Sequence, residues 1–160
     1  MILTTSRKPS KKTRRLAKVL ARFMNWKYLN RGKMSLDELT TFNKIAIIEE
    51  IKGNPAILKI YQNGKNTLKI RFNVSNINKI KMDDSPVFFI GKPPFSPMLL
   101  EAVPQTKAGL KLFRKINAKK KIFVKHKNYD TILIFNYKDV ELFRMKLLTV
   151  EKVIIDDIEE

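Results

Sequence analysis

Basic side chains gather near the start of the chain, where their spacing predicts a surface that binds anions. Between residues 11 and 23, two sets of side chains recur at intervals of three and four, the spacing of one helix face. The basic set is Lys11, Arg15, Lys18 and Arg22. The apolar set is Leu16, Val19, Leu20 and Phe23. The sequence therefore predicts one helix with a buried stripe and a cationic stripe.

The start of this predicted helix favours a phosphate ligand. Ser10 is a candidate N-cap, because its hydroxyl can accept a free amide proton of the first turn. The remaining N–H groups and the positive end of the helix dipole attract anions, and Arg7 and Lys8 lie beside them. No carboxylate precedes Asp37, so the stripe has no local partner. The alternative is a merely solvated surface helix.

A second basic segment lies near residues 107–127, in a stretch from residue 102 to residue 129 without any acid. Thr106 is a candidate cap for a second basic helix, which is expected to end near Asn117. Together the two segments and the turn around Gly32 supply the candidate RNA-binding residues. These are Arg7, Lys8, Lys11, Lys12, Arg14, Arg15, Lys18, Arg22, Arg31, Lys33, Lys111, Arg114, Lys115, Lys119 and Lys120.

The composition supports an anionic partner. The 160 residues hold 33 Lys and Arg against 15 Asp and Glu, a formal net charge of +18. Such self-repulsion lowers stability, and nucleic acid is the commonest ligand that offsets it. The apolar fraction of 44% is that of a globular chain. No apolar run reaches the ~18 residues of a membrane span. With no signal peptide and no cysteine, a cytoplasmic location without disulfides is expected.

Catalytic patterns are weak throughout. The lone His126 lies between two lysines, with no carboxylate or second histidine nearby in sequence. The adjacent pairs Asp83-Asp84 and Glu49-Glu50 would point to opposite faces of a strand, so adjacency builds no metal site. No glycine-rich phosphate loop is present. The sequence predicts no enzyme, no metal and no cofactor.

The elements that must position the basic residues follow a repeated order. An apolar start at residues 2–3 predicts a strand, followed by the first helix and a short extended piece at 26–29. Ser35 and Glu38 form a capping-box pattern for a second helix with Leu36, Leu39 and Phe42 inward. Strands are predicted at 44–51, 56–62 and 67–74, with a hairpin at Asn63-Gly64.

The order then restarts. A strand at 87–90, a helix capped by Thr106 that runs to about Asn117 with Leu110 and Phe113 on one face, and strands at 121–127, 131–138 and 141–148 are predicted. We therefore expect one 160-residue domain made of two topologically similar halves, about 1–80 and about 85–150, with an acidic end at 151–160. The expected fold class is α/β, with mixed sheets and helices packed on them.

The opening residues resemble the Brix-domain family, especially its small archaeal single-domain members. The resemblance rests on five stretches: Thr4-Thr5-Ser6-Arg7-Lys8-Pro9-Ser10, Thr13-Arg14, Leu16-Ala17-Lys18, Arg31-Gly32-Lys33 and Ser35-Leu36-Asp37-Glu38-Leu39. It implies that each half resembles the anticodon-binding domain of class IIa aminoacyl-tRNA synthetases. It also implies binding of precursor ribosomal RNA during ribosome biogenesis. Within the motif, Arg7, Arg14 and Arg31 are assigned RNA contact, and Pro9, Ser10 and Gly32 structural roles.

Three functions remain open from the sequence. The first is a non-catalytic RNA-binding factor of ribosome assembly, with precursor ribosomal RNA as partner and guide RNA or other assembly proteins as further candidates. The second is a ribosomal protein or tRNA-binding module, which would occupy mature subunits or tRNA instead of precursors. The third is a metal-dependent RNA-processing enzyme, which needs clustered acids that the basic segments lack. No membrane partner is expected.

Overall fold

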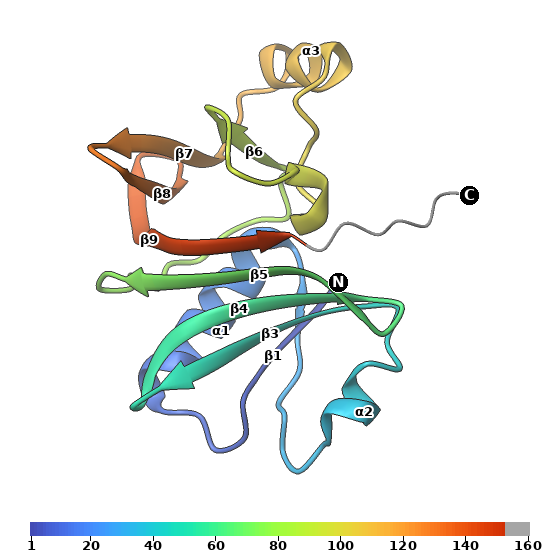
Figure 1. The fold of residues 1–160 in the computed structure, drawn as a ribbon. Helices are drawn as coiled ribbons and strands as arrows, with labels where there is room; N and C mark the ends of the chain where they lie inside the picture. Colours follow the sequence, from blue (N-terminus) through green and yellow to red (C-terminus); the bar gives the residue numbers. More distant parts are fainter. Residues whose placement is uncertain (153–160) are drawn as a thin grey trace.

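The computed structural model describes residues 1–152, and residues 153–160 of the predicted acidic end lie outside the described part. Nine strands form one sheet in the order β2-β1-β3-β4-β5-β9-β8-β7-β6 (Figure 1). The strands are β1 Ile2–Thr5, β2 Lys27–Tyr28, β3 Lys44–Ile51, β4 Asn54–Gln62, β5 Lys65–Val74, β6 Val87–Ile90, β7 Lys120–Lys127, β8 Asp130–Tyr137 and β9 Val140–Lys152. The helices are α1 Lys11–Met24, α2 Leu36–Leu39 and α3 Lys107–Lys115, with a 3₁₀ turn η1 at Pro97–Leu100.

Two series of strands with the same pairing pattern meet in the middle of this sheet. In the first series β1 is parallel to β3, and β3, β4 and β5 are antiparallel neighbours. In the second series β6 is parallel to β7, and β7, β8 and β9 are antiparallel neighbours. The series join where β5 pairs with β9. The chain is thus mixed α/β as predicted, but a single continuous sheet replaces the expected separate sheets.

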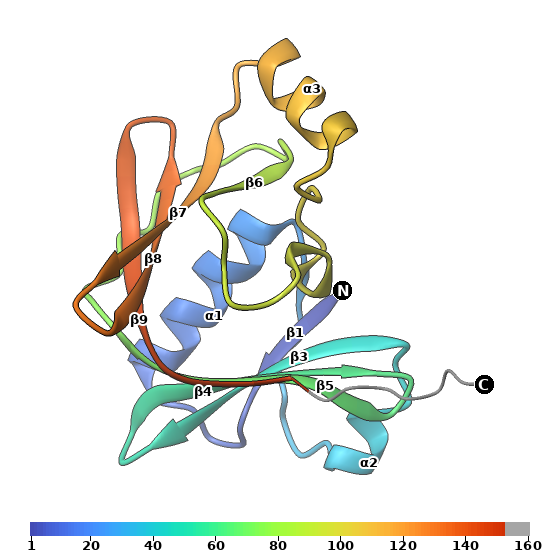
Figure 2. The ribbon, with the colours of Figure 1, turned by 45° about the horizontal axis from the view of Figure 1, so that its top comes forward.

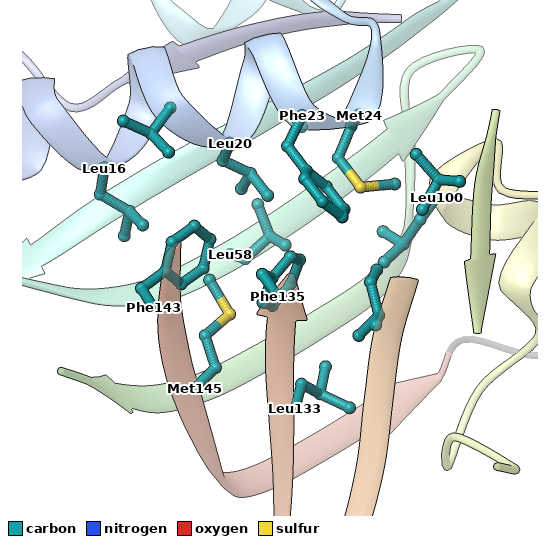
Figure 3. Packing of buried hydrophobic residues seen from close by; sticks show 14 of the residues in the cluster. Leu16, Leu20, Phe23, Met24, Leu58, Leu100, Leu133, Phe135, Phe143 and Met145 are labelled. Carbon is teal, nitrogen blue, oxygen red and sulfur yellow. The ribbon is translucent and has the colours of Figure 1, made fainter. Parts of the chain in front are cut away.

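Helix α1 fills the concave side of the curled sheet (Figure 2). Its buried face packs on β1, β3 and β4 of the first series. In the second series, Phe23 meets the ring of Phe135 in β8 edge-on at 5.5 Å, and Phe135 stacks on Phe143 in β9 at 4.4 Å. Leu16 and Leu20 are fully or almost fully buried in the same cluster (Figure 3). One helix from the first series therefore supplies core to the second series as well.

The predicted helix starts are confirmed, and one predicted inward side chain is wrong. Ser10 caps α1 by accepting from the Thr13 N–H at 3.2 Å. Ser35 and Glu38 form the predicted capping box of α2. Leu39 is buried beside Ile45 and Ile47, whereas Leu36 is 46% exposed. Because α2 is a single turn, only its C-terminal end reaches this cluster.

Helix α3 lies beside the β6 edge of the sheet, apart from its concave side (Figures 1 and 2). It ends at Lys115, two residues before the predicted end, and Gly109 is its one buried residue. Of the two residues predicted to share its apolar face, Leu110 is 48% exposed, while Phe113 is half-buried against Phe88. Since α1 already covers the concave side of both series, α3 finds no equivalent apolar surface there.

Candidate nucleic-acid interface

A basic groove lies between the first two turns of α1 and the segment that leads from β5 to β6. This hollow of about 710 Å³ is lined by Lys11, Lys12, Arg14, Arg15, Lys18, Asn76, Ile77 and Lys79. Six of these eight side chains are cationic and none is acidic. We call it the α1 groove. Lys79, which our sequence prediction missed, belongs to it, because the weak pattern around residues 75–85 gave no reason to place it beside the helix.

Side chains of α1 hold the opposite wall of the groove in place. The Arg15 guanidinium donates through Nε to the carbonyl of Ile77 at 3.1 Å, and Ile77 itself is buried. Farther along the helix, Arg22 donates to Asp84 at 2.6 Å and to the carbonyl of Met82. Arg22 therefore has a carboxylate partner in the tertiary structure, although none is close in sequence. Its main role here is to fasten the segment between β5 and β6 to the helix.

The N-terminus of α1 carries a carboxylate that the sequence did not reveal. Glu50 Oε2 accepts from the Ser10 N–H at 2.7 Å. Burial acts to raise the pKa of Glu50, but hydrogen bonds from Thr13 and Ser10 outweigh it and hold the pKa below its usual value. The expected phosphate site at this helix end is therefore partly neutralised by the protein itself, and the cationic side chains of the α1 groove remain the main attraction for an anion.

Two arginines of the opening motif, Arg7 and Arg31, bind the protein's own backbone. Arg31 donates to the carbonyls of Met34 at 2.7 Å and Thr5 at 2.9 Å. Arg7 donates to the carbonyl of Lys33 at 3.3 Å. Burial, and secondarily the charge of Arg7, lowers the pKa of Arg31. These two arginines join the loop after β1 to the loop before α2, beside the exposed Lys8 and Lys33.

The second group of predicted RNA-binding residues divides between surface and core. Lys111, Arg114 and Lys115 are exposed on α3. Helix α3 itself lies apart from α1 (Figure 2). Lys119 pairs with Asp83 at 2.7 Å. Lys120 is fully buried, so it cannot belong to a surface interface as predicted. The alternation Lys120, Ile122, Val124 along β7 was the signal for its inward position.

Lys120 instead joins the second series of strands to the end of α1. Its ammonium donates to Asn25 Oδ1 at 2.7 Å and to the carbonyl of Arg22 at 3.2 Å. Burial, followed by the charge of Arg22, lowers the pKa of Lys120 to about 8. A cation at a helix C-terminus interacts favourably with the helix dipole. This contact makes Lys120 a structural residue.

Other features matter less to the site. The Lys18 ammonium lies 5.7 Å from the ring centre of the half-buried Tyr28, the aromatic residue between Lys27 and Arg31.

Across residues 1–152, no three His, Asp or Glu side chains come together in a way that could hold a metal ion. His126 is exposed and contacts the Thr131 hydroxyl at 3.3 Å. No helix in the same range is long and apolar enough to span a membrane.

Solved structures share this arrangement of strands and helices. The crystal structure of Mil, an archaeal Imp4-like protein, matches 96% of this chain and 99% of its own with a TM-score of 0.70 at 25% identity. A probable ribosomal biogenesis protein from Aeropyrum pernix K1 matches 91% of this chain and 93% of its own with a TM-score of 0.59 at 18% identity. The chain is therefore a mixed α/β protein with an Imp4-like fold.

Sequence similarity defines the family more narrowly. A probable Brix domain-containing ribosomal biogenesis protein from Archaeoglobus fulgidus is 54% identical over 152 residues, which span 94% of this chain and 97% of the relative. No family model matches the chain. The chain belongs to the family of archaeal Brix domain-containing ribosomal biogenesis proteins, and the resemblance seen in the opening motif is confirmed.

Proposed function

We propose that this protein is a non-catalytic ribosome-assembly factor that holds precursor ribosomal RNA in the α1 groove. The observation that carries the proposal is the lining of the groove, which has six cationic side chains and no acidic one. Lys11, Lys12 and Arg14 are exposed there. Such a surface attracts phosphates, and binding releases the counterions of the RNA.

The groove favours recognition of the RNA backbone over recognition of bases. No aromatic ring lines it, so it offers no platform on which an unpaired base can stack. The fixed wall formed by Asn76, Ile77 and Lys79 gives the groove a defined shape. We infer that the protein reads the path of the phosphate backbone in a folded RNA segment.

Membership in a family of ribosomal biogenesis proteins supports a ribosomal precursor as the RNA. The likeness to anticodon-binding domains remains a prediction, and tRNA is therefore the competing ligand. The particles to which the protein is bound in cells distinguish these two ligands: an assembly factor is bound to precursor ribosomal particles, whereas a tRNA-binding module is not. RNA crosslinking and sequencing from separate gradient fractions of native cells measures this directly.

A charge-reversal variant tests the site. We expect Lys11→Glu combined with Lys12→Glu and Arg14→Glu to weaken binding of a precursor ribosomal RNA fragment by more than tenfold. The slope of log K against log salt should fall by about two to three, because each lost phosphate contact removes about one counterion. These positions are better than Arg7 or Arg15, since both of those bind backbone carbonyls and would also disturb the fold.

Two control variants have the same change in net charge. The first reverses Lys52, Lys65 and Lys127, which are exposed at strand turns. The second reverses Lys111, Arg114 and Lys115 on α3. Fluorescence anisotropy with the same RNA should show a smaller loss for both. Equal loss in all three variants would mean that only total charge matters, and a larger loss in the α3 variant would move the site to the second series.

A further inference from the structure

A second hollow, unlike the α1 groove, lies between the edge strand β6 and α3. Its volume is about 530 Å³, within the range of pockets that bind ligands. The side chains that form its walls are mostly apolar. They include Phe88, Phe89, Ile90, Val103, Leu110 and Phe113. We call it the β6–α3 pocket. Leu110 on its rim is 48% exposed, although it belongs to the apolar face of its helix.

The fold builds this pocket through a close approach of α3 to the preceding segment. A Cβ atom on Gly109 would lie 2.0 Å from the carbonyl oxygen of Pro104, so only glycine lets the first turn of α3 rest there. On the inner side, Phe113 packs edge-on against Phe88 with 5.2 Å between ring centres. The pocket is therefore formed by packed groups on both sides.

The outer edge of β6 is already capped. The Val103 N–H donates to the carbonyl of Val87 at 2.9 Å, and the Gln105 amide donates to the carbonyl of Gly91 at 2.6 Å. A partner strand would have to displace both contacts in order to extend the sheet. An occupant is thus expected to insert side chains into the pocket and leave the strand edge as it is.

The charges around the pocket define the chemistry of the occupant. Lys107 lines the pocket, and Lys121 lies 5.8 Å from the Phe113 ring centre. Lys92 follows the lining residue Gly91 directly, and none of the lining residues is acidic. An apolar pocket with a cationic rim complements a segment that carries bulky apolar side chains between acidic ones.

A nucleobase fits the same pocket less well. Recognition of a base requires free hydrogen-bonding groups at its edge in addition to a stacking surface. Two of the polar groups here are already engaged: the Gln105 Nε2 donates to backbone carbonyls, and the Thr106 hydroxyl accepts the Gly109 N–H as the cap of α3. We propose that the β6–α3 pocket docks a protein partner through an acidic segment with a bulky apolar anchor.

The test begins with a displayed library of random 12-residue peptides, selected on the full-length protein. Selected peptides should combine Leu, Ile, Phe or Trp with flanking Asp or Glu, and should bind with micromolar affinity by titration calorimetry. Replacing their acids with Lys should weaken binding at least fivefold. Failure to enrich any peptide, or enrichment of peptides without acids, would overturn the proposal.

Helix α3 offers a matched pair of variants for the same titration. Leu110 lines the pocket, whereas Leu112 is 38% exposed on the same helix and does not line it. Leu110→Asn should weaken binding of the selected peptides at least fivefold, and Leu112→Asn less than twofold, because only Leu110 lines the pocket. The two substitutions are otherwise matched, since both replace an exposed leucine of the same helix with a neutral side chain. Equal effects would place the peptide elsewhere and refute the site.

An RNA control separates the two classes of partner. A 12-nucleotide single-stranded RNA should bind both variants like the unaltered protein. If its affinity falls selectively in Leu110→Asn, the pocket is a nucleobase site and the protein-docking proposal is wrong. The variant with Lys11, Lys12 and Arg14 reversed should retain peptide binding, because those residues line the other groove.

Discussion

Helices α1 and α3 occupy equivalent places in the two series of strands, yet only α1 is part of the core. Each follows the first strand of its series and begins with a hydroxyl cap, Ser10 or Thr106. Eight of the 14 residues of α1 are buried, against one of the nine in α3. Equivalent topology therefore does not imply equivalent packing: the longer helix covers the concave side of the whole sheet, and the shorter one is left with an exposed apolar face.

The largest expected difference between α1 and α3 arises when aspartate replaces leucine on the apolar face of each helix. Leu16→Asp with Leu20→Asp should unfold the whole described sheet and not the first series alone, because α1 packs on both series and burial of unpaired charge is costly. Leu110→Asp on α3 should change the free energy of unfolding by about 0.5 kcal/mol or less. Urea unfolding and amide NMR spectra measure both. Native amide shifts retained in β7 and β8 of the double variant would show that α1 is not shared.

Aromatic truncation sharpens the same contrast. Phe23→Ala should lower the free energy of unfolding by about 3–5 kcal/mol, because it leaves a cavity beside Phe135 in a fully buried cluster. Phe113→Ala should cost less than half as much, since its ring is only half-buried. Thermal unfolding of both variants gives the comparison. Similar losses would mean that α3 contributes to the core as much as α1 does.

The contact between α1 and β7 predicts a dependence on pH. The pKa of Lys120 is about 8 when folded, so between pH 8 and about 10.4, its usual unfolded value, the unfolded chain binds more protons than the folded one. The contribution of Lys120 to the free energy of unfolding should therefore rise with pH across that window, by about 3 kcal/mol in total. Urea unfolding at pH 7.5, 8.5 and 9.5 measures the slope.

Lys120→Met provides the control for this dependence, because it removes the titrating group and keeps the side-chain length. The slope of stability against pH should be smaller in the variant than in the unaltered protein. If the two slopes are equal, other groups cause the effect and the buried ammonium titrates outside this window.

Helix caps give the smallest expected difference. Ser10→Ala should lower stability by about 1 kcal/mol, because the Thr13 N–H loses its acceptor, whereas the backbone N–H of residue 10 can still donate to Glu50. Thr106→Ala removes the corresponding bond to Gly109, but should cost only a few tenths of a kcal/mol globally, since α3 can fray while the sheet stays folded. Chemical denaturation measures the first loss, and hydrogen exchange in α3 should detect the second.

Local sequence signals predicted most elements but not the contacts between distant ones. The Ser10 cap, the Ser35–Glu38 box and the Asn63-Gly64 hairpin depend on neighbours within a few residues, so the sequence shows them. The pairing of β5 with β9 and the contact of Phe23 with Phe135 join residues far apart in the chain. No periodicity within one segment encodes them.

The candidate site was predicted to a similar extent. The basic face of α1 is exposed where the spacing placed it, and its members Lys11, Arg15 and Lys18 line the α1 groove, whereas Arg22 does not. Lys120 was misplaced because net charge was given more weight than the alternation of β7. The carboxylate partners of Arg22 and of the α1 N-terminus, Asp84 and Glu50, lie far away in sequence, so a search for nearby carboxylates could not find them.

The order of the sheet also determines how the chain can fold during its synthesis. The last described strand, β9, pairs in the middle of the sheet, between β5 and β8. Until β9 has left the ribosome, β5 is an open edge with Leu68, Ile70 and Phe72 on its inward face, and open edges invite pairing with other chains. The nascent chain must therefore keep the edge of β5 from aggregating until β9 has emerged, and the native sheet becomes possible only when both series of strands have been made.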